Sequence, residues 1–401
     1  MLEVERGYMS TYQNKKLVVG VGMSTAFDAA EAGREAAVAA VAALAGETPA
    51  LVIVFTAPRY DLSALLTGIR SITGTALLIG ATGSGEIVQG EYLGFGAGVG
   101  VLAMTAGSYR FGIASASHIR GDLDRAGQTI ARESRTAAGS SPHAAVLLLA
   151  DSLAGNLQQL FQGVYRITGP KVSITGGAAG DEQKFVRTFV FHNDQVIEEG
   201  AVALWIASEQ PLHVVMRHGW EPIGIPLLVT RAEGIEIIEL GGRPAAVVYE
   251  EQLGLAPGQL TAANFWGTSI YHPFGVLQPD GSMVIRMARA KTEQGTLKIQ
   301  GCVPPAGSAV RVMTGTTDTL LNIVGDVAHT ALDAHREAKV LLAFSCAARA
   351  NIFGQRTIEE SRRLQAIAGD IPTFGFYCCG EFARTAGVLG THNASLTAMA
   401  L

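Results

Sequence analysis

Cysteine is scarce in this chain, and the few cysteines present are arranged neither as metal ligands nor as a disulfide framework. There are four in 401 residues, and no two of them form the C-x-x-C pair that is typical of a zinc site. Small disulfide-stabilised proteins have a far higher cysteine content. We therefore expect free thiols at Cys302, Cys346, Cys378 and Cys379.

The chain also lacks a large excess of charge of one sign and lacks long apolar runs. The 30 basic and 35 acidic residues give a net charge of -5, and without a Lys/Arg cluster neither nucleic acid nor an anionic membrane is an expected partner. No apolar run approaches the roughly 18 residues that cross a bilayer. The segment from Met1 to Lys16 is polar and mixed in charge, unlike a secretory signal. We expect a cytoplasmic protein.

Signatures of catalysis and of phosphate binding are also missing. The sequence has no G-x-S-x-G, and Gly-Ala-Thr-Gly-Ser-Gly-Glu at residues 80–86 lacks the Lys-Ser/Thr of a P-loop. Cys346 with a histidine would be a nucleophile pair, but the supporting Asn or Asp cannot be located from sequence. The expectation is a ligand-binding protein and not an enzyme; a cysteine-dependent enzyme and a pure protein scaffold are the rival classes.

What the chain does contain is a repeat. Its three copies are Ile72-Thr73-Gly74 with Gly80 and Gly85-Glu86, Ile167-Thr168-Gly169 with Thr175 and Gly180-Asp181, and Ile367-Ala368-Gly369 with Gly375 and Gly380-Glu381. An apolar run and a helical pattern precede each copy, and sequence suited to a hairpin follows it. Since glycine tolerates the backbone that ends a helix, each Ile-x-Gly should join a helix to a strand. The Gly-acid loops are either architectural or shaped to let the backbone approach a ligand.

The repeat predicts a mixed α/β fold of strand, helix, strand and hairpin units. Two units fill residues 17–210, and residues 211–401 contain a strand-rich block followed by the third unit. The helix of the third unit is expected to begin at Thr357, with Glu360 three residues on as a capping box. Between its first strand and its Ile-x-Gly, this unit is about six residues longer than the others, within Cys346 to Gln355. Loops lengthened in one copy of a repeat often carry function.

With these residues laid out, the chain resembles FIST proteins, a bacterial sensory family with an N-terminal and a C-terminal part. The resemblance covers nearly the whole chain, except that Ala348 stands where related sequences usually have Gly. It is carried by Ile79 to Ile87, Gly176 to Asp181, Gly219 to Gly224 with Val229-Thr230, Glu239 to Tyr249, Phe344 to Arg349, and Phe374 to Tyr377 with Gly380-Glu381 and His392-Asn393.

The resemblance implies two sheets packed between helical layers and a role in sensing a small ligand. Amino acids are the usual proposal for the ligand, and one branch of full-length FIST proteins binds haem b and senses nitric oxide. Such chains regulate a separate histidine kinase or cyclic-di-GMP enzyme; homodimer formation is left open. We expect haem and nitric oxide here, with an amino acid or other small metabolite as the alternative.

The lengthened loop of the third unit is the first place where we expect a ligand. Arg349 there would clamp a carboxylate bidentately, or else pair with Glu381 and tie the loop down. Tyr377 belongs to the same unit. Cys346 is expected in a partly exposed site where Arg349 lowers its thiol pKa; the alternative is a buried small apolar residue. Glu381 and its equivalents in the other units, Glu86 and Asp181, are also expected to bind the ligand, with each carboxylate facing an amine or another hydrogen-bond donor.

Histidine is the expected axial ligand of any haem. No C-x-x-C-H is present, so haem would be held non-covalently. Among nine histidines, the candidates are His218 before Gly-Trp, His272 in Tyr-His-Pro and His392 in Thr-His-Asn, because each lies in a motif-like turn. Only one of the three is expected to bind.

Overall fold

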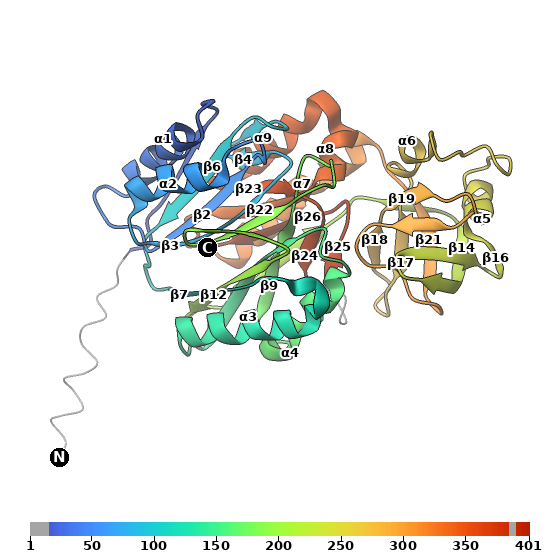
Figure 1. Ribbon diagram of the computed structural model, residues 1–401, viewed down its shortest axis with the longest axis horizontal. Helices are drawn as coiled ribbons and strands as arrows, with labels where there is room; N and C mark the ends of the chain where they lie inside the picture. The colour runs from blue at the N-terminus through green and yellow to red at the C-terminus, as the bar shows by residue number, and fades with distance from the viewer. Residues whose placement is uncertain (1–15, 385–389) are drawn as a thin grey trace, which may run out of the picture.

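The computed structural model describes residues 16–384 and 390–401 (Figure 1). Helices flank several multi-stranded sheets, which confirms the mixed α/β class. Each repeat unit supplies four strands to one six-stranded sheet, so the repeat builds three sheets where two were expected. In the part of the chain that the structure describes, no helix is long and apolar enough to span a membrane.

The three units have the same order of elements. The first unit comprises β1 (Val19–Ser24), α1 (Ala29–Ala42), β2 (Leu51–Thr56), α2 (Leu62–Thr73), β3 (Leu77–Thr82), β4 (Glu86–Val88), β5 (Glu91–Leu93) and β6 (Val99–Met104). The second comprises β7 (Arg110–Ala116), α3 (Leu123–Ala138), β8 (His143–Asp151), α4 (Leu157–Thr168), β9 (Ser173–Ala179), β10 (Phe189–His192), β11 (Gln195–Glu198) and β12 (Ala201–Ser208), with a short 3-10 turn at Ile119–Gly121. The third comprises β13 (Val214–Arg217), α7 (Thr317–Ala334), β22 (Leu341–Cys346), α8 (Ala347–Phe353), α9 (Thr357–Ala368), β23 (Thr373–Cys378), β24 (Glu381–Ala383), β25 (Thr391–His392) and β26 (Leu396–Ala400), with a 3-10 turn at Gly354–Arg356.

Each unit gives its hairpin to the sheet of another unit. The sheet orders are β1-β6-β2-β3-β10-β11, β7-β12-β8-β9-β24-β25 and β13-β26-β22-β23-β4-β5. Thus β4 of the first unit pairs with β23 of the third, β24 of the third with β9 of the second, and β10 of the second with β3 of the first. The Gly-acid pairs of the sequence lie where the chain crosses from one sheet to the next.

The Ile-x-Gly prediction is confirmed in all three units. Gly74, Gly169 and Gly369 each end a helix (α2, α4 and α9) and lead into a strand, with φ between 59° and 63°. Inside the following strand, a side chain on Gly375 would place its Cβ 1.7 Å from the Ala343 carbonyl oxygen. In the middle unit, Thr175 stands at the position equivalent to Gly375, and the next residue, Gly176, is the one whose Cβ would lie 2.0 Å from a carbonyl oxygen of the neighbouring strand.

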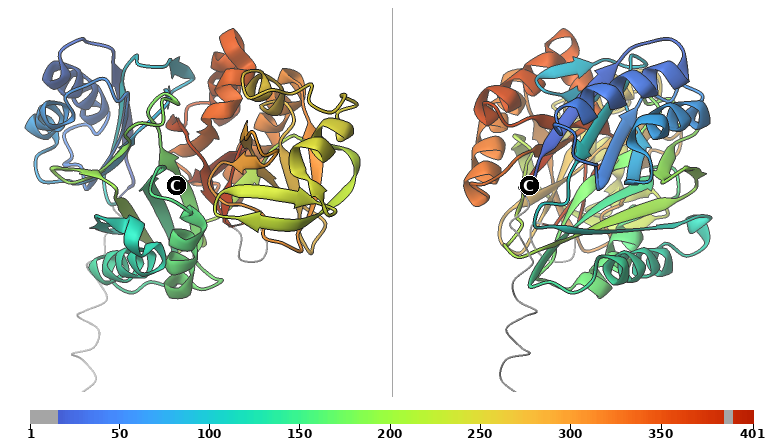
Figure 2. Two further views of the ribbon diagram at one scale, coloured as in Figure 1. Left: turned by 45° about the vertical axis from the view of Figure 1, so that its right-hand side comes forward. Right: turned by 90° about the vertical axis from the view of Figure 1, so that its left-hand side faces the viewer.

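A strand-rich lobe interrupts only the third unit, between β13 and α7 (Figure 2). It has a hydrophobic core of its own, which includes Tyr249, Phe265 and Phe274. The predicted boundary at residues 210/211 stays a prediction. The lobe consists of β14 (Glu221–Glu233), β15 (Glu236–Leu240), β16 (Arg243–Pro244), α5 (Ala245–Gln252), α6 (Phe265–Ser269), β17 (Phe274–Leu277), β18 (Met283–Arg286), β19 (Ala288–Lys291), β20 (Leu297–Ile299) and β21 (Ala309–Thr314).

Aromatic stacking joins the first and third units at the centre of the body. The ring of Phe55 lies 4.1 Å from that of Phe376 and 5.4 Å from that of Phe374, centroid to centroid. All three side chains are fully buried. This shared core and the exchanged hairpins make the three units one body, to which the lobe is attached.

We predict that two glycine-to-alanine changes in the third unit have opposite effects on stability. Gly375→Ala forces the backbones of β22 and β23 apart and should lower the free energy of unfolding by about 3 kcal/mol. Gly325→Ala lies within α7, where the nearest atom to the new Cβ is 3.6 Å away, and should raise it by about 0.5–1 kcal/mol. Urea unfolding checks both; equal stability of the two variants would contradict the close packing of β22 on β23.

Candidate functional site

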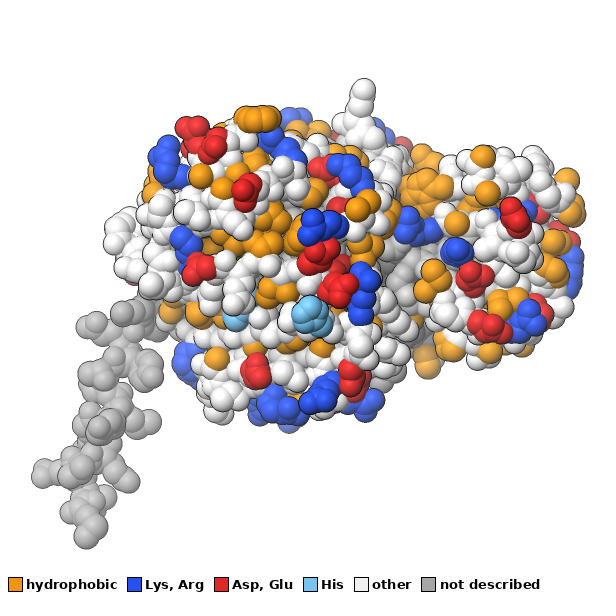
Figure 3. All heavy atoms as spheres, in the orientation of Figure 1, with side chains coloured by type: hydrophobic (Ala, Val, Ile, Leu, Met, Phe, Trp, Pro, Cys, Tyr) orange, Lys and Arg blue, Asp and Glu red, His pale blue; other side chains and the backbone are white. Residues whose placement is uncertain are grey.

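A narrow cleft lies between the body and the lobe, at the carboxyl ends of β22 and β23. Figure 3 shows the lobe as a separate mass beside the body. The cleft has two chambers, of about 30 Å³ and 20 Å³, each with room for only one or two water molecules. Cys379 and Asn393 line both chambers. The outer chamber is further lined by Phe185, Trp266, Met287, Arg289, Cys346 and Cys378, and the inner by Arg286, Cys302, Glu381, Thr391 and His392.

Glu381 is the buried acid of this cleft. One carboxylate oxygen accepts hydrogen bonds from the Ser395 backbone N–H (3.1 Å) and hydroxyl (2.5 Å), and the other lies 3.5 Å from the Cys378 thiol, which donates to it. Burial raises the pKa of Glu381 to about 7, although the Ser395 hydrogen bonds favour the charged form. Near neutral pH this carboxyl is therefore divided between its neutral and charged forms.

The expectation of a partly exposed, reactive Cys346 is wrong. Its side chain is buried, with 5% of the residue exposed, although it does line the outer chamber. Burial and the nearby Glu381 carboxyl raise its thiol pKa well above the usual range, so the thiolate is disfavoured. Burial likewise raises the pKa of Cys378, and that of Cys379 to about 12. These cysteines act as apolar walls at neutral pH, which was the alternative reading of Cys346.

Arg349 is paired within the protein, and not with Glu381. Its guanidinium lies against Glu360, with Nε 3.0 Å from Oε1, and both side chains are fully buried. Tyr377 donates to the other Glu360 oxygen at 2.8 Å. The predicted capping box at Thr357 is therefore wrong, because Glu360 turns to Arg349; the helix does begin at Thr357. The extra residues of the third unit form α8, and neither Arg349 nor Tyr377 lines the cleft.

The acids equivalent to Glu381 serve other purposes. Asp181 accepts backbone N–H bonds from residues 185, 186 and 187 at 2.6–3.1 Å, and so holds a loop in which Glu182, Gln183 and Phe185 have positive φ. This loop covers the outer chamber with Phe185. Glu86 is fully buried, and its carboxyl has no hydrogen-bond partner among the described residues. Burial raises the Glu86 pKa well above its usual range, which favours the neutral acid.

Of the three candidate histidines, only His392 lines either chamber. Its Nε2 lies 2.6 Å from the Ala383 carbonyl oxygen, and because a carbonyl only accepts, Nε2 carries the proton. The other nitrogen, Nδ1, is buried without a partner in the described chain. Burial, together with the Arg286 charge, lowers the His392 pKa to about 3, so the ring is neutral and presents a free lone pair.

The other two histidines have their contacts elsewhere. Nδ1 of His218 accepts a hydrogen bond from the Trp220 N–H at 2.9 Å, and burial lowers its pKa to about 4. His272 lies with Nδ1 3.3 Å from the Met313 carbonyl oxygen. A haem ring does not fit the chambers as they stand, although the Nδ1 lone pair of His392 has the donor chemistry of an axial ligand.

Two arginines of the lobe complete the cleft, and sequence reasoning missed both. Arg286 is 2% exposed; its Nη1 donates to the carbonyl oxygens of Ile285 and Thr391, whereas Nη2 has no hydrogen-bond partner among the residues that the structure describes. Arg289 stacks on Phe185, 3.4 Å from the ring centroid. Over the described ranges 16–384 and 390–401, neither arginine has a carboxylate within ion-pair distance. The alternation of small and basic residues in β19 was a signal that this strand has two faces, but it did not show which face meets the body.

These features are those of a mixed α/β protein with a narrow cleft between its body and its lobe. The chain matches the FIST N domain over residues 50–243 and the FIST C domain over residues 245–384. It therefore belongs to the FIST family, whose domains are small-ligand sensors of signalling systems.

Relatives of known sequence share most of this length. An uncharacterised protein of Mycobacterium tuberculosis H37Rv is 28% identical, over 94% of this chain and 96% of its own. Another, of Mycobacterium bovis, is 27% identical over 93% and 96%. Among solved structures, a cyanuric acid hydrolase from A. caulinodans aligns with 96% of this chain and 99% of its own chain, at 8% sequence identity and with a TM-score of 0.36.

We predict that Glu381 makes the protein less stable as the pH rises. Its folded-state pKa of about 7 exceeds its usual 4.5; between these values the folded form holds a proton that the unfolded form has lost. Stability therefore falls across this window, by up to about 3 kcal/mol. Glu381→Gln should be more stable than wild type at pH 8 and nearly equal to it at pH 5. Urea unfolding at both pH values measures the difference, with the exposed Glu133→Gln as control; an equal difference at both would contradict the raised pKa.

Proposed function

We propose that this protein is a signalling sensor that binds a small carboxylate-bearing ligand in the cleft between body and lobe. The observation that supports this most directly is Arg286, a buried guanidinium at the inner chamber whose Nη2 has no hydrogen-bond partner, and which has no carboxylate within ion-pair distance, among the described residues. An unpaired buried charge costs several kcal/mol. A ligand carboxylate would supply the missing counter-ion and the missing hydrogen bond.

The remaining polar groups of the inner chamber suit an amino acid. The free Nδ1 of His392 accepts a hydrogen bond, and so does the Glu381 carboxyl that lines the same chamber. A ligand that carries an ammonium group beside its carboxylate would satisfy these acceptors and Arg286 together. The cysteines and Met287 of the outer chamber would contact an apolar side chain.

The small size of the cleft implies that the lobe must move when a ligand of this kind binds. Chambers of about 30 Å³ and 20 Å³ do not admit an amino acid unless the lobe moves away from the body. A ligand that binds one arrangement of lobe and body better than another shifts the balance between them. We propose that this shift is what a separate histidine kinase or cyclic-di-GMP enzyme reads in the cytoplasm.

We predict that carboxylate recognition depends on Arg286. Amino acids and small mono- and dicarboxylates, screened by thermal shift, should include a ligand that stabilises the wild type. Calorimetry should then show Arg286→Met binding it about 30-fold more weakly or worse, the loss expected when one partner of a buried charge pair is removed. Arg243→Met is the matched control, an exposed lobe arginine paired with Glu251. A neutral ligand that Arg286→Met binds as well as wild type would contradict the proposal.

Haem b remains the second candidate ligand, with nitric oxide as its signal. The unpaired Nδ1 of His392 favours haem as a ligand because it could coordinate the iron. The two chambers, by contrast, are too small for the haem ring. Added haemin should give a Soret band with wild type and with the controls His218→Ala and His272→Ala, and none with His392→Ala. A band retained by all three variants would show that the histidine is wrongly chosen. A wild type that never takes up haem would leave the amino-acid proposal.

A further inference from the structure

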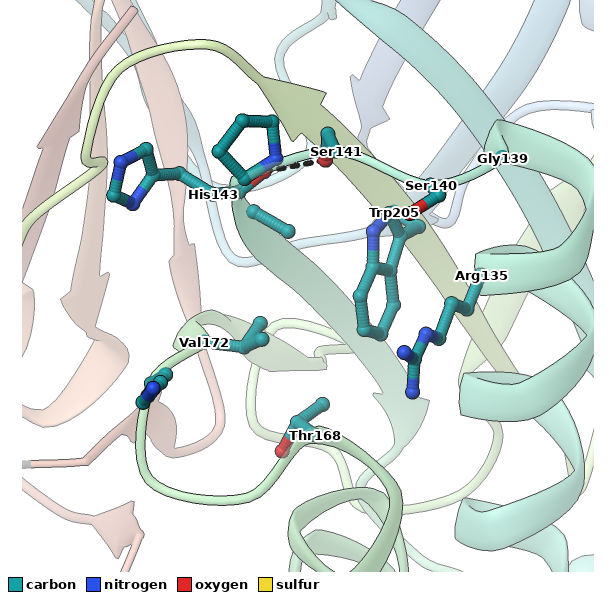
Figure 4. Close-up of a pocket in the computed structure, with 11 residues that line it drawn as sticks. Arg135, Gly139, Ser140, Ser141, His143, Thr168, Val172 and Trp205 are labelled. Atoms are coloured by element: carbon teal, nitrogen blue, oxygen red, sulfur yellow. Dashed lines mark hydrogen bonds between the residues drawn. The ribbon is translucent and has the colours of Figure 1, made fainter.

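An open groove lies on the body at the carboxyl ends of α3 and α4, and it is separate from the cleft. Two adjoining hollows form it, each of about 560 Å³, and they share Arg135, Gly139 and Ser140. Figure 4 shows the side chain of Arg135 alongside the indole of Trp205, with Thr168 and Val172 on the opposite side of the hollow. The Arg135 guanidinium lies 5.7 Å from the Trp205 ring centroid.

Positive charge is concentrated along this groove, on a chain whose net charge is -5. Arg132, Arg135, Arg166 and Lys171 line it, and none of the described lining residues is acidic. Arg166 pairs with Asp124 at 3.0 Å. Arg135 and Arg166 lie in the last turns of their helices and complement the negative helix ends. Arg132 and Lys171 have no such role, and they form no ion pair with any described residue.

The groove is better suited to carboxylates than to phosphate. Phosphate sites use helix N-termini, whose free N–H groups and positive dipole ends attract anions. Here both helices present their carboxyl ends, whose negative dipole disfavours any anion close to the backbone. The cations are exposed and spread over separate elements instead of converging on one point, which suits several separate carboxylates better than one phosphate. Pro142, Val172 and Trp205 add an apolar wall beside the charges. Acidic side chains with apolar neighbours match this pattern of charge and wall.

We propose that this groove docks an acidic segment of a partner protein, with carboxylates on Arg132, Arg135 and Lys171 and an apolar side chain against the wall. The surroundings favour this place over the rest of the surface, because a protein of net negative charge repels an acidic partner elsewhere. The inference does not rest on the ligand proposed for the cleft.

A short fluorescein-labelled peptide of Asp, Glu and Leu serves as the probe, measured by fluorescence anisotropy on the full chain. We expect binding that weakens as salt is added and that is at least about tenfold weaker in Arg132→Gln/Arg135→Gln. Arg120→Gln/Arg125→Gln removes the same charge in the first turn of α3 and in the 3-10 turn before it, as the matched control, and should bind like wild type. Circular dichroism verifies that both variants fold.

Four results would overturn the proposal. The first is a peptide that does not bind, and the second is equal weakening in the control variant, which would indicate general electrostatic attraction. The third is binding of inorganic pyrophosphate, lost in Arg132→Gln/Arg135→Gln, without binding of the peptide; the groove would then be a small-anion site. A peptide with Asn and Gln in place of Asp and Glu, binding as well as the acidic one, would contradict the role of the carboxylates.

Discussion

The cyclic exchange of hairpins is the constraint on which the rest of the structure depends. Each sheet is completed by a hairpin from another unit, so no unit can close its own sheet edge. At the crossings, backbone bonds of 2.8 Å join Ser84 and Tyr377 in one direction and Tyr377 and Gly85 in the other. Another bond of 2.8 Å joins Gly180 to Thr82. The carboxyl ends of β3, β9 and β23 therefore lie together, and the Gly-acid pairs are located at this meeting point.

Equivalent positions in this arrangement have different surroundings, because the lobe interrupts only one unit. The Asp181 carboxylate accepts hydrogen bonds from the backbone of its own loop, and Glu86 is buried inside the body. Of the three acids, only Glu381 lines the cleft. The lobe creates this difference by covering the ends of β22 and β23. A pseudo-symmetric body thus obtains one asymmetric site, without a catalytic or binding motif that the sequence would reveal.

Local signals in the sequence predicted the fold well, whereas the site depends on contacts between distant residues. Helix ends at Gly74, Gly169 and Gly369 follow from what glycine permits locally. Neither alternative for Arg349, a ligand carboxylate or Glu381, named its partner Glu360, because the sequence contains several acids in this unit and only packing decides between them. Burial of Cys346 could not be predicted from its neighbours, since the lobe that covers it is encoded elsewhere. For the same reason the strand pattern around Arg286 did not indicate that it faces the body.

Arg286 also explains how ligand binding in the cleft would change the position of the lobe relative to the body. Its Nη1 joins the lobe to the exchanged hairpin through the Thr391 carbonyl oxygen, at 2.8 Å, while its Nη2 is left without a partner. The same side chain therefore holds lobe and body together and bears a charge that burial penalises, without an ion-pair partner among the described residues; the Glu381 carboxyl offsets only part of this penalty. A carboxylate that satisfies this charge removes a cost of keeping the two parts closed. If that cost is present only when lobe and body are in contact, the proposed ligand binding and the position of the lobe would be thermodynamically linked.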